Sequence, residues 1–139
     1  MLLGEYKYSV DAKGRLFVPA PMRDEMGELV VISRSFDKCI NVYSKDKWAE
    51  FLAKFDSLPM TKARDFKRYL CAYAFEAVPD AQGRIVVAPS LREHAGLEKE
   101  ALVIGVDDHA EIWKPSEFES YCGNLESSDM ISKLTELGF

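Results

Sequence analysis

Apolar and polar residues alternate near the N-terminus, where Tyr6, Tyr8 and Val10 are each separated by one polar side chain. A period of two is typical of a β-strand that buries one face. A second strand is expected over 15–18, and Pro19 ends it because proline has no backbone N–H to donate. The chain is therefore expected to open with two short strands.

The segment between these strands predicts a tight turn. Asp11 can accept a hydrogen bond from the backbone two residues further on, and Gly14 accepts a positive φ. We therefore expect the strands 6–10 and 15–18 to form a hairpin that is closed by the loop 11–14.

The later segments follow the same order in each half: strand, strand, short helix, strand, strand and helix. Pro21 suits the first turn of a short helix, and Ser44 is expected to cap a longer one. Capping boxes are expected at Ser90 and Ser116, each with a glutamate three residues on. The remaining expected elements are hairpins of 29–33 with 39–43 and of 101–106 with 110–113, and helices over 61–74 and 127–137.

The helical segments carry apolar residues spaced i, i+3, i+4 and i+7, which is the pattern of one buried helix face. We interpret these stripes as core packing. The residues concerned are Trp48, Phe51, Leu52, Phe55, Phe66, Leu70, Tyr73, Phe118, Tyr121, Cys122 and Leu125.

The chain contains one module twice. The pentapeptide Asp-Ala-Lys-Gly-Arg at 11–15 returns as Asp-Ala-Gln-Gly-Arg at 80–84, and Arg23 returns at the same offset as Arg92. A duplicated unit of about 50 residues accounts for this similarity. Because a chain of that length buries only a marginal core, the two copies are expected to share one core.

We expect four parts, which together place the chain in the α+β class. They are a first repeat over 1–58, a connecting helix over 59–73, a second repeat over 74–126 and an acidic C-terminal helix over 127–139.

Composition narrows the class of protein. The chain of 139 residues is 47% hydrophobic and 29% charged, as in ordinary compact soluble domains. It opens with no basic segment followed by an apolar run, and no stretch approaches the roughly 18 apolar residues of a membrane span. Three widely spaced cysteines indicate neither a disulfide framework nor a zinc site. We expect a cytoplasmic protein with no membrane partner.

The net charge of −5 disfavours a nucleic-acid partner, but the distribution of charge matters more than its sum. Residues 1–23 carry four basic and two acidic side chains, whereas residues 116–139 carry one lysine and five acidic side chains. An acidic chain of this kind can still present a basic face.

Candidate catalytic groups are few. His94 is expected on a short helix, and His109 in the turn 107–109, where a metal site is conceivable. Three consecutive side chains point in different directions, however, and aspartate in a turn is explained by backbone hydrogen bonding. Nucleotide-binding, nucleophile and zinc-protease motifs are absent. We expect neither an enzyme nor a cofactor, metal or small-molecule substrate.

The repeated Asp-x-x-x-Arg loop concentrates the candidate chemistry. An ion pair of Asp11 with Arg15, and of Asp80 with Arg84, is the simplest explanation of the motif. An exposed pair is worth only about 0–1 kcal/mol, which is a weak reason to find arginine in both copies. The planar fork of arginine suits phosphate groups and guanine edges, which indicates a nucleic-acid partner.

These motifs resemble the MraZ family, and the resemblance extends from residue 1 to about residue 125. Besides the two loops, it rests on Gly4-Glu5-Tyr6, Leu16-Phe17-Val18-Pro19, Ile85-Val86-Val87-Ala88-Pro89, the segment from Leu91 to Leu97, and Glu111-Ile112-Trp113.

The resemblance implies a tandem AbrB-like swapped-hairpin β-barrel, in which the two repeats interleave with pseudo-twofold symmetry and carry flanking helices. It also implies that several chains close into a homo-oligomeric ring. MraZ proteins are bacterial, nucleoid-associated transcriptional regulators encoded at the head of the division and cell-wall gene cluster. By this resemblance the chain binds double-stranded DNA at short direct repeats upstream of its own gene.

By the same resemblance, the principal DNA-binding residues are Arg15 and Arg84. The other residues of the expected site are Asp11, Lys13, Gly14, Arg23, Asp80, Gly83 and Arg92. Because Gln82 stands where the first loop has Lys13, the first repeat is the stronger candidate for DNA contact. The second repeat is expected to serve partly in packing between subunits.

Two other classes of function stay open. One is a protein-interaction module, such as an AbrB-like antitoxin or an assembly scaffold, that engages a partner through the acidic C-terminal helix. The other is an enzyme, for which the sequence offers no site. Binding of the pure protein to DNA upstream of its own gene separates a regulator from an interaction module.

Overall fold

All 139 residues are described by the computed structural model of the protein, which has the α+β class expected from the sequence. The strands are β1 (Glu5–Ser9), β2 (Arg15–Phe17), β3 (Val30–Arg34), β4 (Ile40–Ser44), β5 (Phe75–Ala77), β6 (Arg84–Val86), β7 (Glu100–Gly105) and β8 (Ala110–Trp113). The helices are α1 (Ala20–Met26), α2 (Lys45–Ala53), the 3₁₀ turn η1 (Lys54–Ser57), α3 (Met60–Cys71), α4 (Pro89–Ala95), α5 (Pro115–Ser127) and α6 (Met130–Glu136).

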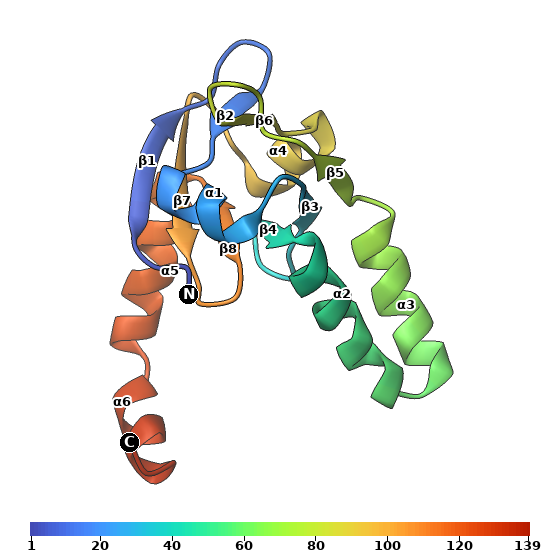
Figure 1. Ribbon diagram of the computed structural model, residues 1–139. Coiled ribbons are helices and arrows are strands. Elements are labelled where there is room, and N and C mark those ends of the chain that lie inside the picture. The colour runs from blue at the N-terminus through green and yellow to red at the C-terminus, as the bar shows by residue number, and fades with distance from the viewer.

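Strand pairing crosses between the two repeats (Figure 1). Six strands form a sheet in the order β1-β7-β8-β4-β3-β5, and β2 pairs with β6 in a separate two-stranded element, the β2–β6 ribbon. Every pair is antiparallel. The equivalent strands of the two repeats are β1 and β5, β3 and β7, and β4 and β8. They occupy matching places from the two ends of the sheet, so the pairing is symmetric between the repeats.

The hairpin expected from strands 6–10 and 15–18 does not form. The loop itself is present, since the Gly14 N–H donates to the Asp11 carbonyl oxygen over 3.0 Å. Beyond the loop, however, β1 pairs with β7 and β2 pairs with β6, both from the other repeat. The prediction is wrong about which strands pair, because the turn residues determine the conformation of the loop but not the pairing of the strands on either side of it. The two other expected hairpins, β3 with β4 and β7 with β8, are confirmed.

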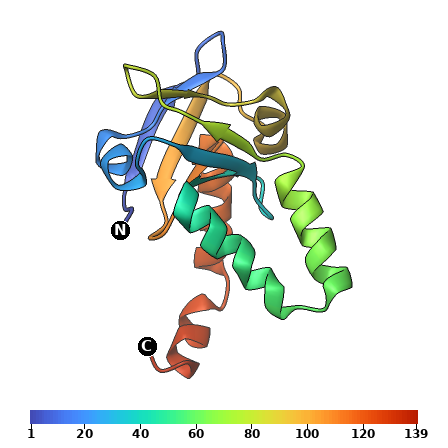
Figure 2. The same ribbon diagram turned by 45° about the vertical axis from the view of Figure 1, so that its right-hand side comes forward.

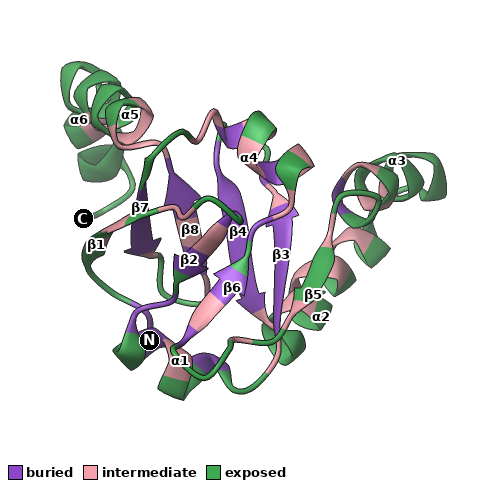
Figure 3. Cartoon of the chain, turned by 90° about the horizontal axis from the view of Figure 1, so that it is seen from above, coloured by how far each residue is buried: buried purple, intermediate pink, exposed green.

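A single large hydrophobic core lies between the six-stranded sheet and the β2–β6 ribbon (Figure 3). Of its 17 buried residues, nine belong to residues 1–58 and eight to residues 74–126. In the ribbon, Leu16 and Ile85 lie opposite each other and both are buried. Met22 of α1 and Leu91 of α4 join the same core. Neither repeat therefore has a complete core of its own.

The apolar helical stripes lie mostly outside the core. Helices α2 and α3 extend together from one side of the sheet, and α5 and α6 extend from the other (Figures 1 and 2). Of the eleven stripe residues, only Leu70 is buried. Phe118 is half-buried and packs against a small core cluster of Cys39, Leu102, Ile104 and Trp113. The interpretation as core packing is therefore wrong for most of the others. Several pack on one another instead, as do Phe55 and Phe66 with ring centroids 5.5 Å apart. The spacing of a helix face is the same whether or not another element covers it.

Only one of the three predicted serine caps is confirmed. Ser44 Oγ accepts a hydrogen bond from the backbone N–H three residues on, over 3.2 Å, and caps α2. Helices α4 and α5 begin at Pro89 and Pro115, so Ser90 and Ser116 lie inside the first turn and cap nothing. Proline favours the first helical position because its fixed φ suits the helix and its missing N–H is not needed there.

The separate C-terminal helix that the sequence predicts over 127–137 is confirmed, but it is shorter than expected. Helix α5 continues to Ser127, and α6 spans Met130–Glu136. Helix α6 makes little contact with the rest of the chain, and Leu137 and Phe139 beyond it are 74% and 88% exposed. None of the helices combines the length and the apolar character that a membrane crossing requires.

His109, in the turn between β7 and β8, contacts a strand of the first repeat. Its ring stacks on that of Tyr43 in β4, with centroids 4.7 Å apart. Its Nδ1 lies 2.7 Å from Asp108 Oδ1, and its Nε2 lies 3.3 Å from Glu111 Oε2. Burial disfavours the charged ring, but the hydrogen bonds to Glu111 and Asp108 outweigh it, so the pKa of His109 is raised above 6.5. These contacts support a structural role for the turn 107–109.

We expect the contribution of His109 to stability to fall as the pH rises. Because its pKa is higher in the folded chain than the unfolded value of 6.5, the stabilisation is fully present below that pH and is lost as the pH rises through the folded pKa. The difference in melting temperature between the protein and His109→Gln should therefore shrink as the pH rises, down to the part that comes from the stack on Tyr43. A difference that grows with pH would contradict the assignment.

Candidate functional site

The loops 11–14 and 80–83 lie side by side at one end of the molecule, away from α3 and α6 (Figures 1 and 2). Each loop leads into one strand of the β2–β6 ribbon. In the ribbon, Arg15 lies opposite Val86, and Phe17 lies opposite Arg84. Side chains alternate along a strand, so these four share the outward face while the middle residue of each strand faces the core.

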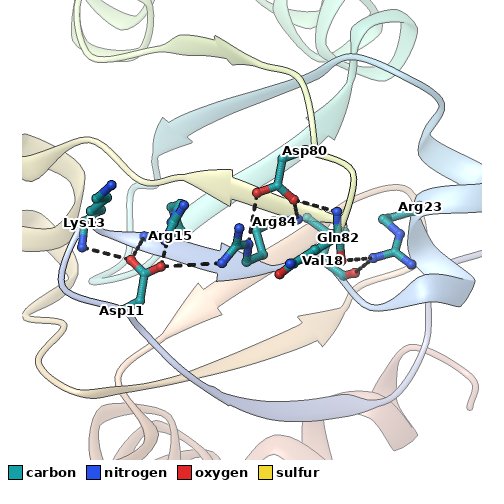
Figure 4. A network of polar contacts seen from close by, with 8 residues as sticks. All are labelled: Asp11, Lys13, Arg15, Val18, Arg23, Asp80, Gln82 and Arg84. Carbon is teal, nitrogen blue, oxygen red and sulfur yellow. Dashed lines mark hydrogen bonds and ion pairs between the residues drawn. The ribbon is translucent and has the colours of Figure 1, made fainter.

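Asp11 organises the first loop (Figure 4). Its Oδ1 accepts hydrogen bonds from the backbone N–H of Lys13 over 2.9 Å and of Arg15 over 2.8 Å, and its Oδ2 accepts one from Arg15 Nε over 2.6 Å. These bonds, chiefly the one from the Arg15 backbone, lower the pKa of the Asp11 carboxyl. The carboxylate therefore holds both the turn and the inner end of the Arg15 guanidinium.

Asp80 organises the second loop in the same way (Figure 4). Its Oδ1 accepts hydrogen bonds from the backbone N–H of Gln82 and of Arg84, each over 2.9 Å, and its Oδ2 accepts one from Arg84 Nε over 2.9 Å. The backbone N–H of Arg84 is the main cause of the lowered pKa of the Asp80 carboxyl. Both ion pairs considered in the sequence are present, and each of them also orients an arginine.

The aspartates hold the two arginines chiefly at Nε. The terminal amino groups of Arg15 make no hydrogen bond within the chain, whereas Arg84 Nη1 also forms an ion pair with Asp11 Oδ2 of the other repeat, over 3.9 Å. Lys13 is exposed beside them, and its ammonium group forms no ion pair. The face thus offers two oriented guanidinium forks and one ammonium group, which suit phosphate oxygens and guanine edges.

Arg23 and Arg92 come from α1 and α4 rather than from the ribbon. Arg23 Nη1 donates to the Val18 carbonyl oxygen over 3.2 Å, and Arg92 Nε donates to the Val87 carbonyl oxygen over 3.1 Å. These guanidinium groups are bound to the backbone where each ribbon strand ends. The structure therefore brings together the aspartates, Lys13 and the loop arginines, and Arg23 and Arg92 border the two loops from α1 and α4.

Two residues of the outward face were missed in the sequence analysis. Phe17 and Val86 are 38% and 58% exposed, and each lies opposite one of the ribbon arginines. The period of two along the strands could have identified them, because it places Phe17 on the same face as Arg15. The site therefore combines charged and apolar groups. No group of three or more His, Cys, Asp or Glu side chains in the chain is placed to hold a metal ion.

The two halves of the chain both match one family model, which is described as "MraZ protein, putative antitoxin-like" and covers residues 1–68 and 70–137. The chain belongs to the MraZ family. A transcriptional regulator MraZ from Alkaliphilus oremlandii is 44% identical over 142 residues, which is 99% of each chain. One from Moorella thermoacetica is 44% identical over 138 residues, covering 98% of this chain and 95% of the relative. One from Lactobacillus delbrueckii subsp. bulgaricus is 42% identical over 136 residues, covering 96% and 95%.

The MraZ match confirms the family resemblance drawn from the sequence motifs. Each matched segment contains one Asp-x-x-x-Arg loop, with Arg15 in the first and Arg84 in the second. The two MraZ segments are therefore the two copies that interlock through the β2–β6 ribbon.

Proposed function

We propose that this MraZ-family protein is a sequence-specific transcriptional regulator that binds double-stranded DNA through the β2–β6 ribbon. The observation that carries this proposal is the pair of outward arginines, Arg15 and Arg84, each bound at Nε by an aspartate. A guanidinium that is already oriented loses less conformational freedom when it binds a phosphate or a guanine. The relatives, which are named transcriptional regulators, support the proposal.

Each loop residue has a role in this proposal. Arg15 and Arg84 contact the DNA, and Lys13 adds a contact to a phosphate. Asp11 and Asp80 orient the two arginines, while Gly14 and Gly83 adopt the positive φ of the turn. The first loop makes the stronger contact, because the second carries Gln82 in place of lysine and its arginine side chain is 21% exposed, against 31% for Arg15.

We further propose that the repeats, 1–58 and 74–126, form a swapped-hairpin barrel and that several chains close into a ring. The symmetric pairing of strands across the repeats supports the barrel. The sheet ends in the strands β1 and β5, which leave unpaired backbone groups at its edges. In a ring, contacts between neighbouring subunits would cover these sheet edges, and they would also cover the exposed apolar residues near α6. The ring then presents its ribbons to successive DNA direct repeats upstream of its own gene, at the division and cell-wall gene cluster.

A titration of the full chain with labelled duplexes tests this function. The duplex from upstream of its own gene should bind at least about 10³-fold more tightly than a scrambled duplex of equal composition at physiological salt. Equal affinity for both duplexes would overturn sequence-specific binding. If neither duplex binds, the exposed apolar residues of the C-terminal segment favour the second candidate, an AbrB-like protein-interaction module.

We expect Arg15→Ala to weaken binding to this duplex by about 1–3 kcal/mol for each site contacted, as for the loss of a bidentate base contact. The melting temperature should change little, because the pair of Arg15 with Asp11 is partly exposed and such pairs contribute about 0–1 kcal/mol. Arg84→Ala should also weaken binding to this duplex, but by a smaller amount than Arg15→Ala. Arg64→Ala, on an exposed face of α3, is the matched control. Unchanged affinity for Arg15→Ala, or a large loss of melting temperature, would contradict the assignment.

A further inference from the structure

We propose that Arg23 and Arg92 do not contact DNA but act as positioning residues, each of which holds the DNA-binding loop of the opposite repeat. The inference rests on the proposed function of the loops. It assigns to the helices α1 and α4 the task of fixing the geometry at which the loop arginines meet their ligand.

Arg23, from the first repeat, holds the second loop. Its Nη1 donates to the Val18 carbonyl oxygen over 3.2 Å and to the Gln82 carbonyl oxygen over 3.4 Å (Figure 4). The same junction is closed by the Val18 N–H, which donates to the Gly83 carbonyl oxygen over 2.9 Å. One guanidinium therefore joins the end of its own strand to the loop of the other repeat.

Arg92, from the second repeat, occupies the equivalent place beside the first loop. Its Nε donates to the Val87 carbonyl oxygen over 3.1 Å, and the Val87 N–H donates to the Gly14 carbonyl oxygen over 2.8 Å. Its guanidinium lies directly against Gly14, since a Cβ added there would be only 2.9 Å from Arg92 Cζ. Arg23 therefore holds the second loop by a hydrogen bond, whereas Arg92 contacts the first loop by packing against Gly14 and bonds the strand end that is itself bonded to Gly14.

The glycines of the loops make room for these arginines. A Cβ on Gly83 would overlap the Arg23 guanidinium, and one on Gly14 would crowd that of Arg92. A positive φ alone is tolerated by asparagine and aspartate, whereas a side chain at either glycine would also force the neighbouring guanidinium out of its place. Each repeat therefore supplies both a loop with a space and an arginine that fills the space in the other loop.

Arg23 Nη1 and Arg92 Nε donate to backbone carbonyl oxygens, whereas Arg15 Nε and Arg84 Nε donate to the carboxylate of the aspartate in their own loop. This difference separates the four arginines into two pairs with different tasks. The pair on the ribbon meets the ligand, and the pair on the helices keeps the ribbon and its loops in place.

Amide hydrogen exchange on the free full-length protein tests the crossed arrangement. Three backbone amides at each loop donate to the loop aspartate: those of Lys13, Gly14 and Arg15 to Asp11, and those of Gln82, Gly83 and Arg84 to Asp80. In Arg23→Ala, the second set should exchange about 5- to 30-fold faster, as for the loss of one or two hydrogen bonds, while the first set stays unchanged. Arg92→Ala should produce the reverse pattern, because it removes the guanidinium that packs against Gly14 and the bond to Val87, whose N–H donates to the Gly14 carbonyl oxygen.

Arg23→Lys and Arg92→Lys keep the positive charge and the side-chain stem but lose the fork, so they should show the same crossed pattern if the alanine variants do not fold. Arg64→Ala is again the control and should change neither loop. Faster exchange only in the loop of the mutated repeat, or in neither loop, would overturn the proposal.

A DNA titration over a range of salt gives a second, independent result. A residue that binds a phosphate contributes about 0.9 to the slope of log affinity against log salt. Arg23→Lys should weaken binding to the upstream duplex and leave this slope unchanged. Restored affinity in Arg23→Lys together with a lowered slope in Arg23→Ala would show direct phosphate contact and overturn the proposal. If the wild-type chain binds no DNA, the proposed function is wrong. The hydrogen-exchange measurement on the free protein still decides whether Arg23 and Arg92 hold the loops.

Discussion

A fragment of residues 1–58 is expected not to fold as a monomer. In the full chain, β1 and β2 have all their ladder partners in the second repeat, and β3 and β4 each pair with one strand beyond residue 58. The fragment also supplies only nine of the 17 residues of the shared core. A chain of this length buries too little surface to compensate for these losses.

Circular dichroism and light scattering on the fragment measure this outcome. The fragment should show no cooperative melt, or it should pair with a second copy that replaces the missing repeat. Mixing it with residues 59–139 is the matched control and should restore the melt of the full chain. A monomeric fragment with a cooperative melt would show that the first repeat has a sufficient core of its own.

The second large effect concerns the number of DNA direct repeats. With a net charge of −5 and one or two basic loops per chain, a single subunit neutralises few phosphates and should bind weakly at physiological salt. If a ring holds several ribbons side by side, a duplex with several direct repeats at helical spacing should bind roughly 10²–10⁴-fold more tightly than a duplex with one. The gain comes from linked binding events and needs no additional contact within a site.

A duplex in which one direct repeat is shifted by about half a helical turn is the control, because the shifted site then faces away from the ribbons. Most of the gain should disappear with this duplex. Light scattering on the free protein gives the number of subunits in the same solution. A monomer that binds one direct repeat as tightly as several would contradict linked binding while leaving DNA binding itself in place.

The sequence predicted those parts of the candidate site in which the contacting residues are only a few positions apart in the chain. Asp11 bonds residues two and four positions on, and Asp80 does the same, so the motif alone identifies the loop and its arginine. The position of Arg92 against Gly14 was not predictable, because the two residues lie in different repeats. Matching Arg23 and Arg92 by sequence offset showed that they are equivalent, but it gave no information on what they contact.

The apolar stripes of the helices show a second limit of prediction from the sequence, which concerns burial. The spacing of Trp48, Phe51 and Phe55 predicts an apolar helix face, which α2 has, but not the element that covers it. In the chain by itself these rings pack mainly on Tyr43, on Phe66 and on one another. Whether a face is buried depends on what lies opposite it, and that information is not contained in the helix.

From the sequence alone came the duplication, the two loops with their aspartates and arginines, the α+β class and the family. These properties depend on residue identity and on contacts over a few positions, so they can be inferred without knowing how the chain folds. The core shared by both repeats was also expected from their length, and the structure confirms it. Only the tertiary structure decided that β2 pairs with β6 and that each loop lies against an arginine of the other repeat. Such long-range contacts depend on which of several compatible strands pair, and this choice is made by packing of the whole chain rather than by any single segment.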